Sequence, residues 1–244
     1  MGLPTIAVPQ YELTIPSTEK KAKYRPFLVK EEKVLLIALE SENQTNIINA
    51  IRTIISNCLY GDVNVDEMPT FDLEYIFLQL RAKSKGEVID LKYECPKCKT
   101  ELEVNINTED VQVIKTPEHT NTIELDPDLG VVMKYPTIEM QQMIQEIQED
   151  KKSEVEGIFT MVTKCIDYIY DKDNTYPLKD HTEKEINDFI DSLTDVHFQK
   201  ISKFFDTMPV LKHEFKLNCT KKKKDKTCSY KETITLSGLQ SFFA

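Results

Sequence analysis

The first third of the chain changes between the alternation typical of strands and the three-to-four-residue spacing typical of helices. Apolar and polar residues alternate through residues 11–29 around a Pro-Ser-Thr turn, which predicts a β-hairpin. Residues 31–40 carry acidic residues early and apolar residues later, and residues 47–59 repeat isoleucine and leucine at helical spacing, so each segment predicts a helix. A third helix follows, and Thr70 is expected to cap it.

The middle of the chain consists of short strand-like runs. Residues 87–94 and 100–107 alternate apolar and polar positions on either side of a turn, which predicts a second hairpin. Residues 108–136 contain further short extended runs, VQVI, TIEL and VVMKY, separated by loops. This part of the chain is therefore expected to be mainly β-structure.

The second half returns to helical patterns. Residues 136–148 and 153–170 each place apolar residues along one stripe, so both predict helices. Thr182 and Glu185 have the spacing of a capping box, which predicts the start of the next helix. Thr194 is expected to cap the helix after it.

Two stretches far apart in the sequence share one order: strand, cysteine, connector, cysteine, alternating strand. The first is LKYECPKCKTELEVNI at residues 91–106, and the second is FKLNCTKKKKDKTCSYKETITL at residues 215–236. The first pair has the CPxC spacing of a tight turn that presents two thiolates to one ion and directs backbone N–H groups at the sulfurs. The second pair is separated by a long insert, TKKKKDKT.

These stretches predict a structural zinc site with four ligands: Cys95, Cys98, Cys219 and Cys228. Cysteines at CxxC spacing in a reducing compartment indicate metal ligands more readily than disulfides. Four thiolates complete the zinc tetrahedron and leave no position for water or substrate, so such a site is structural. Zinc binding of this kind supplies about 10–16 kcal/mol that couples to folding.

The insert Lys221–Lys226 leaves alternatives open. Its lysines could contact phosphates, as nucleic-acid-binding zinc ribbons do, but no exposed aromatic residues interleave with them for base stacking, and a solvated loop is the favoured interpretation. The insert could also prevent the second pair from reaching one ion, leaving two reduced pairs without metal. His213 could replace one ligand, although a solvated strand position suits it better.

Together these patterns predict an α+β fold. It comprises a helical body with an N-terminal β-hairpin and a zinc-ribbon-like β element built from two distant cysteine hairpins. We expect three parts: residues 1–86 as hairpin and helices, residues 87–107 with 211–244 as the ribbon, and residues 108–210 as a mainly helical insertion.

Composition narrows the classes of function. The 244-residue chain has a net charge of −10, so as a whole it would repel a phosphate backbone, and a nucleic-acid role would need a local basic patch. Its 6 glycines argue against phosphate-cradling loops. No apolar run approaches the roughly 20 residues that span a bilayer, and the first residues lack the pattern of a secretory signal peptide.

No catalytic constellation emerges from the sequence. Cys58 and Cys165 fall on apolar helix faces and are interpreted as small buried hydrophobic residues. Asp171 opens a D-x-D-N cluster that lacks the glycine and glutamate of a calcium loop, so it is expected to be an ordinary turn. The histidines are scattered, and the common hydrolase and nucleotide-binding motifs are missing. We therefore expect a protein that is not an enzyme.

Several longer strings carry a family resemblance. YELTIPSTEKKAKYRPFLVKEEKVLLIALES, FDLEYIFLQLRAKSKGEVIDLKYECPKC and the final TITLSGLQSFF resemble the baseplate hub subunit and hub assembly family of T-even type contractile-tailed bacteriophages. The long second knuckle departs from that family's usual short one. The resemblance implies a structural or assembly protein whose partners are other baseplate hub or tail proteins. It places the chain in the host cytoplasm during assembly and in the tail baseplate of the virion.

Two segments are candidate partner-binding surfaces under this interpretation. One is the N-terminal stretch Tyr24, Arg25, Pro26 and Phe27, and the other is the C-terminal pair Phe242 and Phe243. A short exposed aromatic tail suggests docking, although it could also fold onto the ribbon.

Overall fold

The computed structural model describes residues 6–61, 63–140, 142–143, 154–223 and 226–242. The chain divides into two compact units, one made of Met1–Val65, Phe71–Ile114 and Val210–Ala244, the other of Asp66–Thr70 and Lys115–Pro209. Helices and antiparallel sheets occur in both, so the α+β class is confirmed. The division into three parts stays a prediction.

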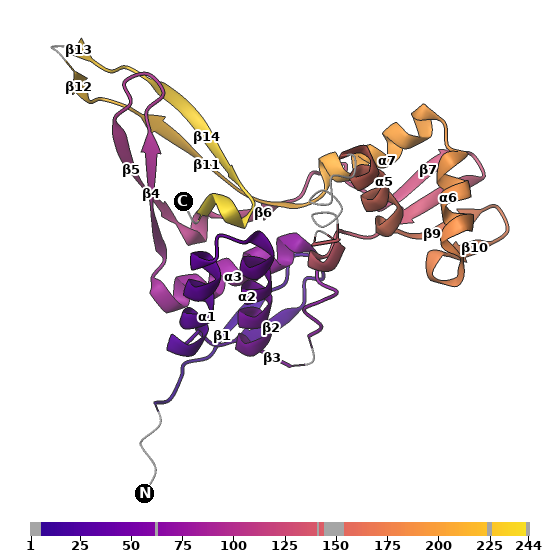
Figure 1. The fold of residues 1–244 in the computed structure, drawn as a ribbon, viewed down its shortest axis with the longest axis horizontal. Helices are drawn as coiled ribbons and strands as arrows, with labels where there is room; N and C mark the ends of the chain where they lie inside the picture. The colour runs from indigo at the N-terminus through magenta and orange to yellow at the C-terminus, as the bar shows by residue number, and fades with distance from the viewer. Residues whose placement is uncertain (1–5, 62, 141, 144–153, 224–225, 243–244) are drawn as a thin grey trace, which may run out of the picture. The chain divides into compact units, whose positions relative to one another are not determined.

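The N-terminal part of the first unit is a small sheet with helices (Figure 1). Strand order is β1-β2-β3, and Tyr11 lies opposite Tyr24 in the predicted hairpin. The two helices that follow are also as predicted, and Asn43 caps the second by accepting a hydrogen bond from the Asn46 N–H. The elements are β1 (Tyr11–Thr14), β2 (Lys21–Tyr24), α1 (Val29–Glu40), α2 (Gln44–Cys58) and β3 (Leu59–Tyr60).

Helix α3 (Thr70–Lys85) supplies much of the core of this unit, with Leu73, Ile76 and Phe77 almost fully buried. Buried Asp72 accepts hydrogen bonds from the backbone N–H and the hydroxyl of Ser17, which ties the β1–β2 turn to the helix. The prediction that Thr70 caps this helix is wrong.

Thr70 is instead the first helical residue. Its N–H and its hydroxyl both donate to the carbonyl oxygen of Pro136, each at 3.1 Å. A distant segment therefore satisfies an unpaired N–H of the first turn that a local side-chain cap would otherwise serve.

Two antiparallel hairpins complete the first unit and lie side by side in Figure 1. Strands β4 and β5 pair with each other, and the other hairpin belongs to a sheet of order β14-β11-β6. Leu91 and Ile106 of the first hairpin share a core with Leu211 and Leu236 of the second and with Leu78 of α3. The elements are β4 (Val88–Glu94), β5 (Glu101–Asn107), η1 (Thr108–Asp110), β6 (Gln112–Ile114), β11 (Val210–Asn218) and β14 (Lys231–Ser237).

The second unit begins and ends at adjacent points. Ile114, the last residue of β6, lies opposite Val210, the first residue of β11, and the chain between them forms most of the second unit. That unit packs helices against a sheet of order β10-β9-β8-β7. Its elements are β7 (Thr122–Asp126), β8 (Leu129–Met133), α5 (Glu154–Cys165), β9 (Ile166–Asp171), β10 (Thr175–Pro177), η2 (Leu178–Asp180), α6 (Glu183–Asp191) and α7 (Asp195–Thr207).

The predicted caps of α6 and α7 are confirmed, with Thr182 and Glu185 forming a capping box and Thr194 accepting from the His197 N–H. The prediction of one helix over residues 153–170 is wrong beyond Cys165, because Ile166–Asp171 is strand β9. That strand is paired on both sides, with β8 and β10, and cross-strand pairing overrides a spacing that also suits a helix. Of the helix predicted over residues 136–148, residues 138–140 and 142–143 are helical, and residues 141 and 144–148 lie outside the described residues.

Candidate metal centre

The turn between β4 and β5 is the predicted first knuckle. The Cys95 N–H donates to the carbonyl oxygen of Thr100 at 2.9 Å, and the Lys99 N–H donates back to the carbonyl oxygen of Cys95 at 2.8 Å. Lys99 has a φ of 59°, a left-handed conformation that closes the turn tightly. Two backbone bonds therefore hold Cys95 and Cys98 on one side of a narrow turn.

The turn between β11 and β14 repeats this arrangement despite its insert. The Cys219 N–H donates to the carbonyl oxygen of Tyr230 at 2.9 Å, as Cys95 does to Thr100. Thr100 and Tyr230 each stand two residues after the second cysteine of their pair. Cysteine spacing alone does not indicate these acceptor positions. Aligning the two hairpin sequences at their second cysteines does indicate them.

The strand registers continue the repeat. Glu94 pairs with Glu101 in one hairpin, and Asn218 pairs with Lys231 in the other. In each case the residue before the first cysteine pairs with the residue three after the second. The two hairpins therefore share the hydrogen bond from the first cysteine and the strand register beside it, whereas the bond from Lys99 to Cys95 is described for the first knuckle alone.

The lysine insert leaves the knuckle as a separate hairpin. Strand β12 (Lys222–Lys223) pairs with β13 (Lys226–Thr227), and the Cys228 N–H donates to the carbonyl oxygen of Lys221 at 2.9 Å. This bond places Cys228 directly beside Lys221, although the segment 222–227 separates them in the sequence. In Figure 1, β12 and β13 extend beyond the end of β11 and β14. The insert therefore does not hold the second cysteine pair apart.

The four predicted ligands come together. Their sulfur atoms all lie within 4.8 Å of one another: Cys95, Cys98, Cys219 and Cys228. The Cys95–Cys228 and Cys98–Cys219 sulfur distances are 3.9 Å and 3.6 Å. These distances fit a tetrahedral tetrathiolate, since metal–sulfur bonds of about 2.3 Å place the sulfurs about 3.8 Å apart. They are far longer than the roughly 2.05 Å of a disulfide bond.

Most of the sulfur atoms are shielded from solvent. Cys95, Cys219 and Cys228 are buried, and they share a cluster with Leu102 and Leu217 from the two hairpins. Cys98 is the more accessible ligand. A buried four-sulfur site without an open coordination position can stabilise the fold but cannot activate water.

Hydrogen bonding and burial act in opposite directions on two of the thiols. The Thr100 hydroxyl beside Cys98 Sγ is the main reason that the pKa of Cys98 falls to about 6. The Lys221 N–H lowers the pKa of Cys219, but burial and the neighbouring thiols outweigh it and raise that pKa to about 12. Four adjacent thiols cannot all ionise unless a cation offsets their charge, so the cluster is suited to a bound metal ion.

His213 lies away from this cluster, with its ring nitrogen Nδ1 3.2 Å from the carbonyl oxygen of Asp110. The other cysteines behave as expected. Cys58 and Cys165 are fully buried, and burial raises their pKa values to about 11 and about 12. Asp171 likewise closes an ordinary turn by accepting the backbone N–H groups of Asp173 and Asn174.

The N-terminal candidate surface contributes mainly to the interior of the protein. Tyr24 and Phe27 are 2% and 6% exposed, and Pro26 is buried. Arg25 forms an ion pair of 2.8 Å with buried Glu31. Burial would raise the pKa of Glu31, but the Arg25 guanidinium and the Leu28 N–H together lower it. These residues stabilise the start of α1, and a role in partner binding stays a prediction.

The C-terminal candidate begins with an ordered turn. The Leu239 N–H donates to Glu74 Oε1 of α3 at 3.1 Å, and Leu239 opens the short helix η3 (Leu239–Phe242). Gly238 precedes it at a φ of 72°, and a Cβ at Gly238 would lie 3.3 Å from the same carboxylate oxygen. Phe243 lies outside the described residues, and partner binding through Phe242 and Phe243 stays a prediction.

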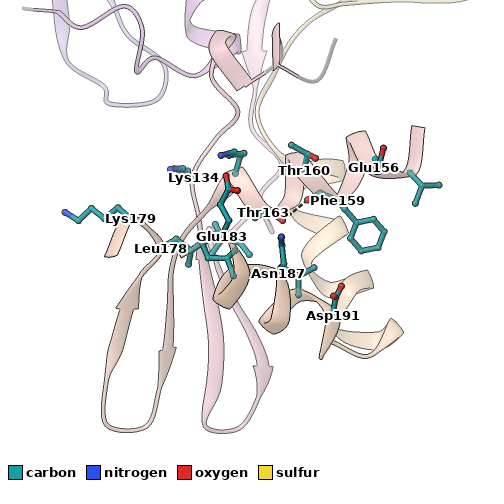
Figure 2. A pocket seen from close by; sticks show the side chains of 15 residues that line it. Lys134, Glu156, Phe159, Thr160, Thr163, Leu178, Lys179, Glu183, Asn187 and Asp191 are labelled. Carbon is teal, nitrogen blue, oxygen red and sulfur yellow. Dashed lines mark hydrogen bonds between the residues drawn. The ribbon is translucent and has the colours of Figure 1, made fainter. Parts of the chain in front are cut away.

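The second unit contains a groove of about 580 Å³ between α5 and α6 (Figure 2). Phe159 and Leu178 contribute apolar surface, whereas Lys134, Lys179 and Glu183 contribute charge. The described residues that line it include no histidine or cysteine.

Comparison with known proteins places the chain in a family. A family model described as T4 bacteriophage base plate protein matches residues 8–244. The chain belongs to this family. It is also similar to the baseplate hub assembly protein gp26 of Enterobacteria phage T4, with 24% identity over 187 residues that cover 76% of this chain and 78% of that protein. No solved structure shows a significant match.

Membership in the T4 base plate protein family confirms the resemblance drawn from the sequence strings. None of the helices in the described residues combines the length and hydrophobicity that crossing a membrane requires. The four-cysteine cluster is thus a feature of a phage baseplate family member, and it connects two ends of a long chain segment.

Proposed function

We propose that this protein is a non-enzymatic structural or assembly factor of a bacteriophage tail baseplate hub. It acts through protein–protein interaction with other hub or tail proteins, in the host cytoplasm during assembly and in the tail baseplate. The family match over residues 8–244, together with similarity to a protein named for baseplate hub assembly, carries this proposal.

The cysteine cluster holds a structural zinc ion in this proposal. All-cysteine ligation, with two sulfur separations of 3.6 and 3.9 Å and all of them within 4.8 Å, suits zinc, a d¹⁰ ion without redox chemistry that prefers tetrahedral thiolate sites. The residues that hold it are Cys95, Cys98, Cys219 and Cys228. The ion fixes one hairpin to the other, and the ribbon so formed presents a rigid surface to hub partners.

The assembly role is tested by depletion and reconstitution. Phage that lack this gene should produce free tail precursors but no complete baseplate hubs, and the purified protein should bind purified hub proteins of the same phage. Normal hubs in the depleted infection, with no binding to any hub protein, would contradict the proposal.

A nucleic-acid-binding zinc ribbon is the second candidate, because β12 and β13 pair with each other and carry lysines of the segment 221–226. It predicts binding to DNA or RNA that weakens steeply as salt increases. Filter binding at low salt tests it. No retention of either nucleic acid would exclude this candidate and leave the assembly role untouched.

A further inference from the structure

The two cysteine hairpins leave two strand edges unpaired on either side of a groove. Strand β5 pairs only with β4 among the described strands, and β11 pairs with β14 on one side and with β6 on the other. The β6 pairing covers only the start of β11, Val210 to Lys212. Beyond Lys212 the same edge of β11 has no partner strand among the described residues.

Hydrogen-bond alternation shows which backbone groups point into this space. The bond from Cys95 to Thr100 marks a hydrogen-bonded pair, so the next pair along, Glu94 with Glu101, turns its backbone groups outward. The uninterrupted register repeats this at Glu103. Next to the knuckle, the N–H and C=O groups of β5 that point away from β4 are therefore those of Glu101 and Glu103.

The same argument applies to the second hairpin. The bond from Cys219 to Tyr230 marks the hydrogen-bonded pair there, so Asn218 and Lys216 direct their backbone groups away from β14. Pairing of Lys212 with Gln112 of β6 agrees with this alternation, since Lys212 belongs to the same set of outward residues.

These four residues line one groove of about 560 Å³: Glu101, Glu103, Lys216 and Asn218. Leu102, Val104 and Leu217 also line it. Hydrogen-bonded strands lie about 4.8 Å apart in the plane of their sheet, so an added strand can pair with the open edge of β5. The groove therefore runs along the open edge of β5, with β11 on its other side and mainly polar residues at its surface.

We propose that this groove receives an extended segment of another baseplate hub protein, which pairs with the open edge of β5 as an added strand and lies beside β11. The side chains of the added strand that face Leu102 and Leu217 are expected to be apolar. The outward side chains of the added strand lie between Glu103 and Lys216, which are both exposed. An acidic side chain there would be repelled by Glu103, and a basic one by Lys216. Uncharged residues that both donate and accept, such as Ser, Thr, Asn or Gln, fit there. The inference rests on the proposed assembly function and names the surface it uses.

The test uses the full-length protein and overlapping synthetic peptides from the hub proteins of the same phage. A bound peptide should slow hydrogen exchange at the amides of Glu101 and Glu103 by about tenfold or more, because each gains a backbone hydrogen bond. Failure of every peptide to bind, or binding that leaves these amides unprotected, would overturn the inference. Protection that appears without peptide and grows with protein concentration would show that a second copy of the chain occupies the groove, which also overturns it.

A matched pair of proline variants separates the strand pairing from general damage. Glu103→Pro removes an outward N–H at the groove, whereas Lys92→Pro removes the outward N–H of its cross-strand partner on the opposite edge of the hairpin. The first should weaken peptide binding about tenfold and the second should not. If Glu103→Pro still captures hub proteins as well as the unchanged protein does, strand addition fails and the assembly role stands. If the unchanged protein captures none, the assembly role itself fails.

Discussion

Cys228 donates its backbone N–H to the carbonyl oxygen of Lys221 at 2.9 Å. This one bond joins the two sides of the lysine insert at its base, so the chain enters and leaves the β12–β13 hairpin at neighbouring points. The remaining knuckle, Cys219-Thr220-Lys221 followed by Cys228, then has the local geometry of a CxxC pair.

Removing residues 222–227 should therefore leave the metal centre intact. The deletion joins Lys221 directly to Cys228, and the sequence Cys-Thr-Lys-Cys reproduces the spacing of Cys95 and Cys98. Native mass spectrometry should find the same zinc content as in the full chain. A deletion protein that folds but binds no zinc would show that the hairpin itself is needed to position the second pair.

Cys95→Ser should abolish zinc binding and unfold the ribbon, because a structural zinc site contributes about 10–16 kcal/mol of apparent binding free energy. Cys58→Ala is the matched control: this buried thiol lies outside the cluster, and its loss should cost about 1–2 kcal/mol without changing the zinc content. Elemental analysis with urea unfolding measures both effects. Equal zinc content in the two variants would contradict zinc ligation by Cys95.

Arg25→Ala should destabilise the protein by about 3 kcal/mol, since it removes the nearer and less exposed of the two cations beside the buried carboxylate of Glu31 and leaves only Lys30, at 3.4 Å. The side chains of this pair are 11% and 2% exposed. Lys21→Ala breaks the exposed ion pair with Glu12 and should leave the unfolding midpoint unchanged. Chemical denaturation compares the two, and similar midpoints would mean that the Arg25 pair is not a structural contact.

Deprotonation of the Glu74 carboxyl should lower the free energy of unfolding as pH rises. Burial raises its pKa to about 7, with the Leu239 N–H opposing that shift, against an ordinary value of 4.5. The folded state therefore binds a proton that the unfolded state has lost between about pH 4.5 and pH 7, and stability falls across that range by an amount on the order of 3 kcal/mol.

Glu74→Gln isolates this effect, because it keeps an acceptor for Leu239 and has no charge to bury. Relative to the unchanged protein it should be more stable at pH 8, with the difference disappearing toward pH 4.5. Urea unfolding at several pH values measures this. A pH-independent difference would mean that the Glu74 carboxyl does not titrate in this range.

The sequence predicts the first knuckle well because its chemistry is local. Cys95, Cys98 and the two alternating strands are close in sequence, and the bonds from Cys95 to Thr100 and from Lys99 to Cys95 span only a few residues. The second knuckle is harder to predict, since the position of Cys228 depends on pairing within the insert. Spacing alone therefore leaves the fourth ligand undecided.

Tertiary contacts explain what the patterns do not predict. The stripe through Cys165 and Ile169 suits a helix, but pairing of Ile169 with Val131 of β8 makes this segment a strand. The stretch around Arg25 contains a charged residue and aromatic rings, a composition common at binding surfaces. Its burial depends on Glu31 and on helices that only the folded chain brings near. A charged residue in a sequence is usually expected to face water, but the side chains of Arg25 and Glu31 are largely buried.

The opposition of Ile114 and Val210 at the base of the second unit has a consequence for synthesis on the ribosome. The first two sulfur ligands emerge early, but the chain must then be extended through the whole second unit before Cys219 and Cys228 leave the exit tunnel. A nascent chain interrupted anywhere before Cys228 can offer an ion at most three of these sulfurs. Completion of the metal centre is thus a late event in biosynthesis, and it distinguishes finished protein from truncated translation products.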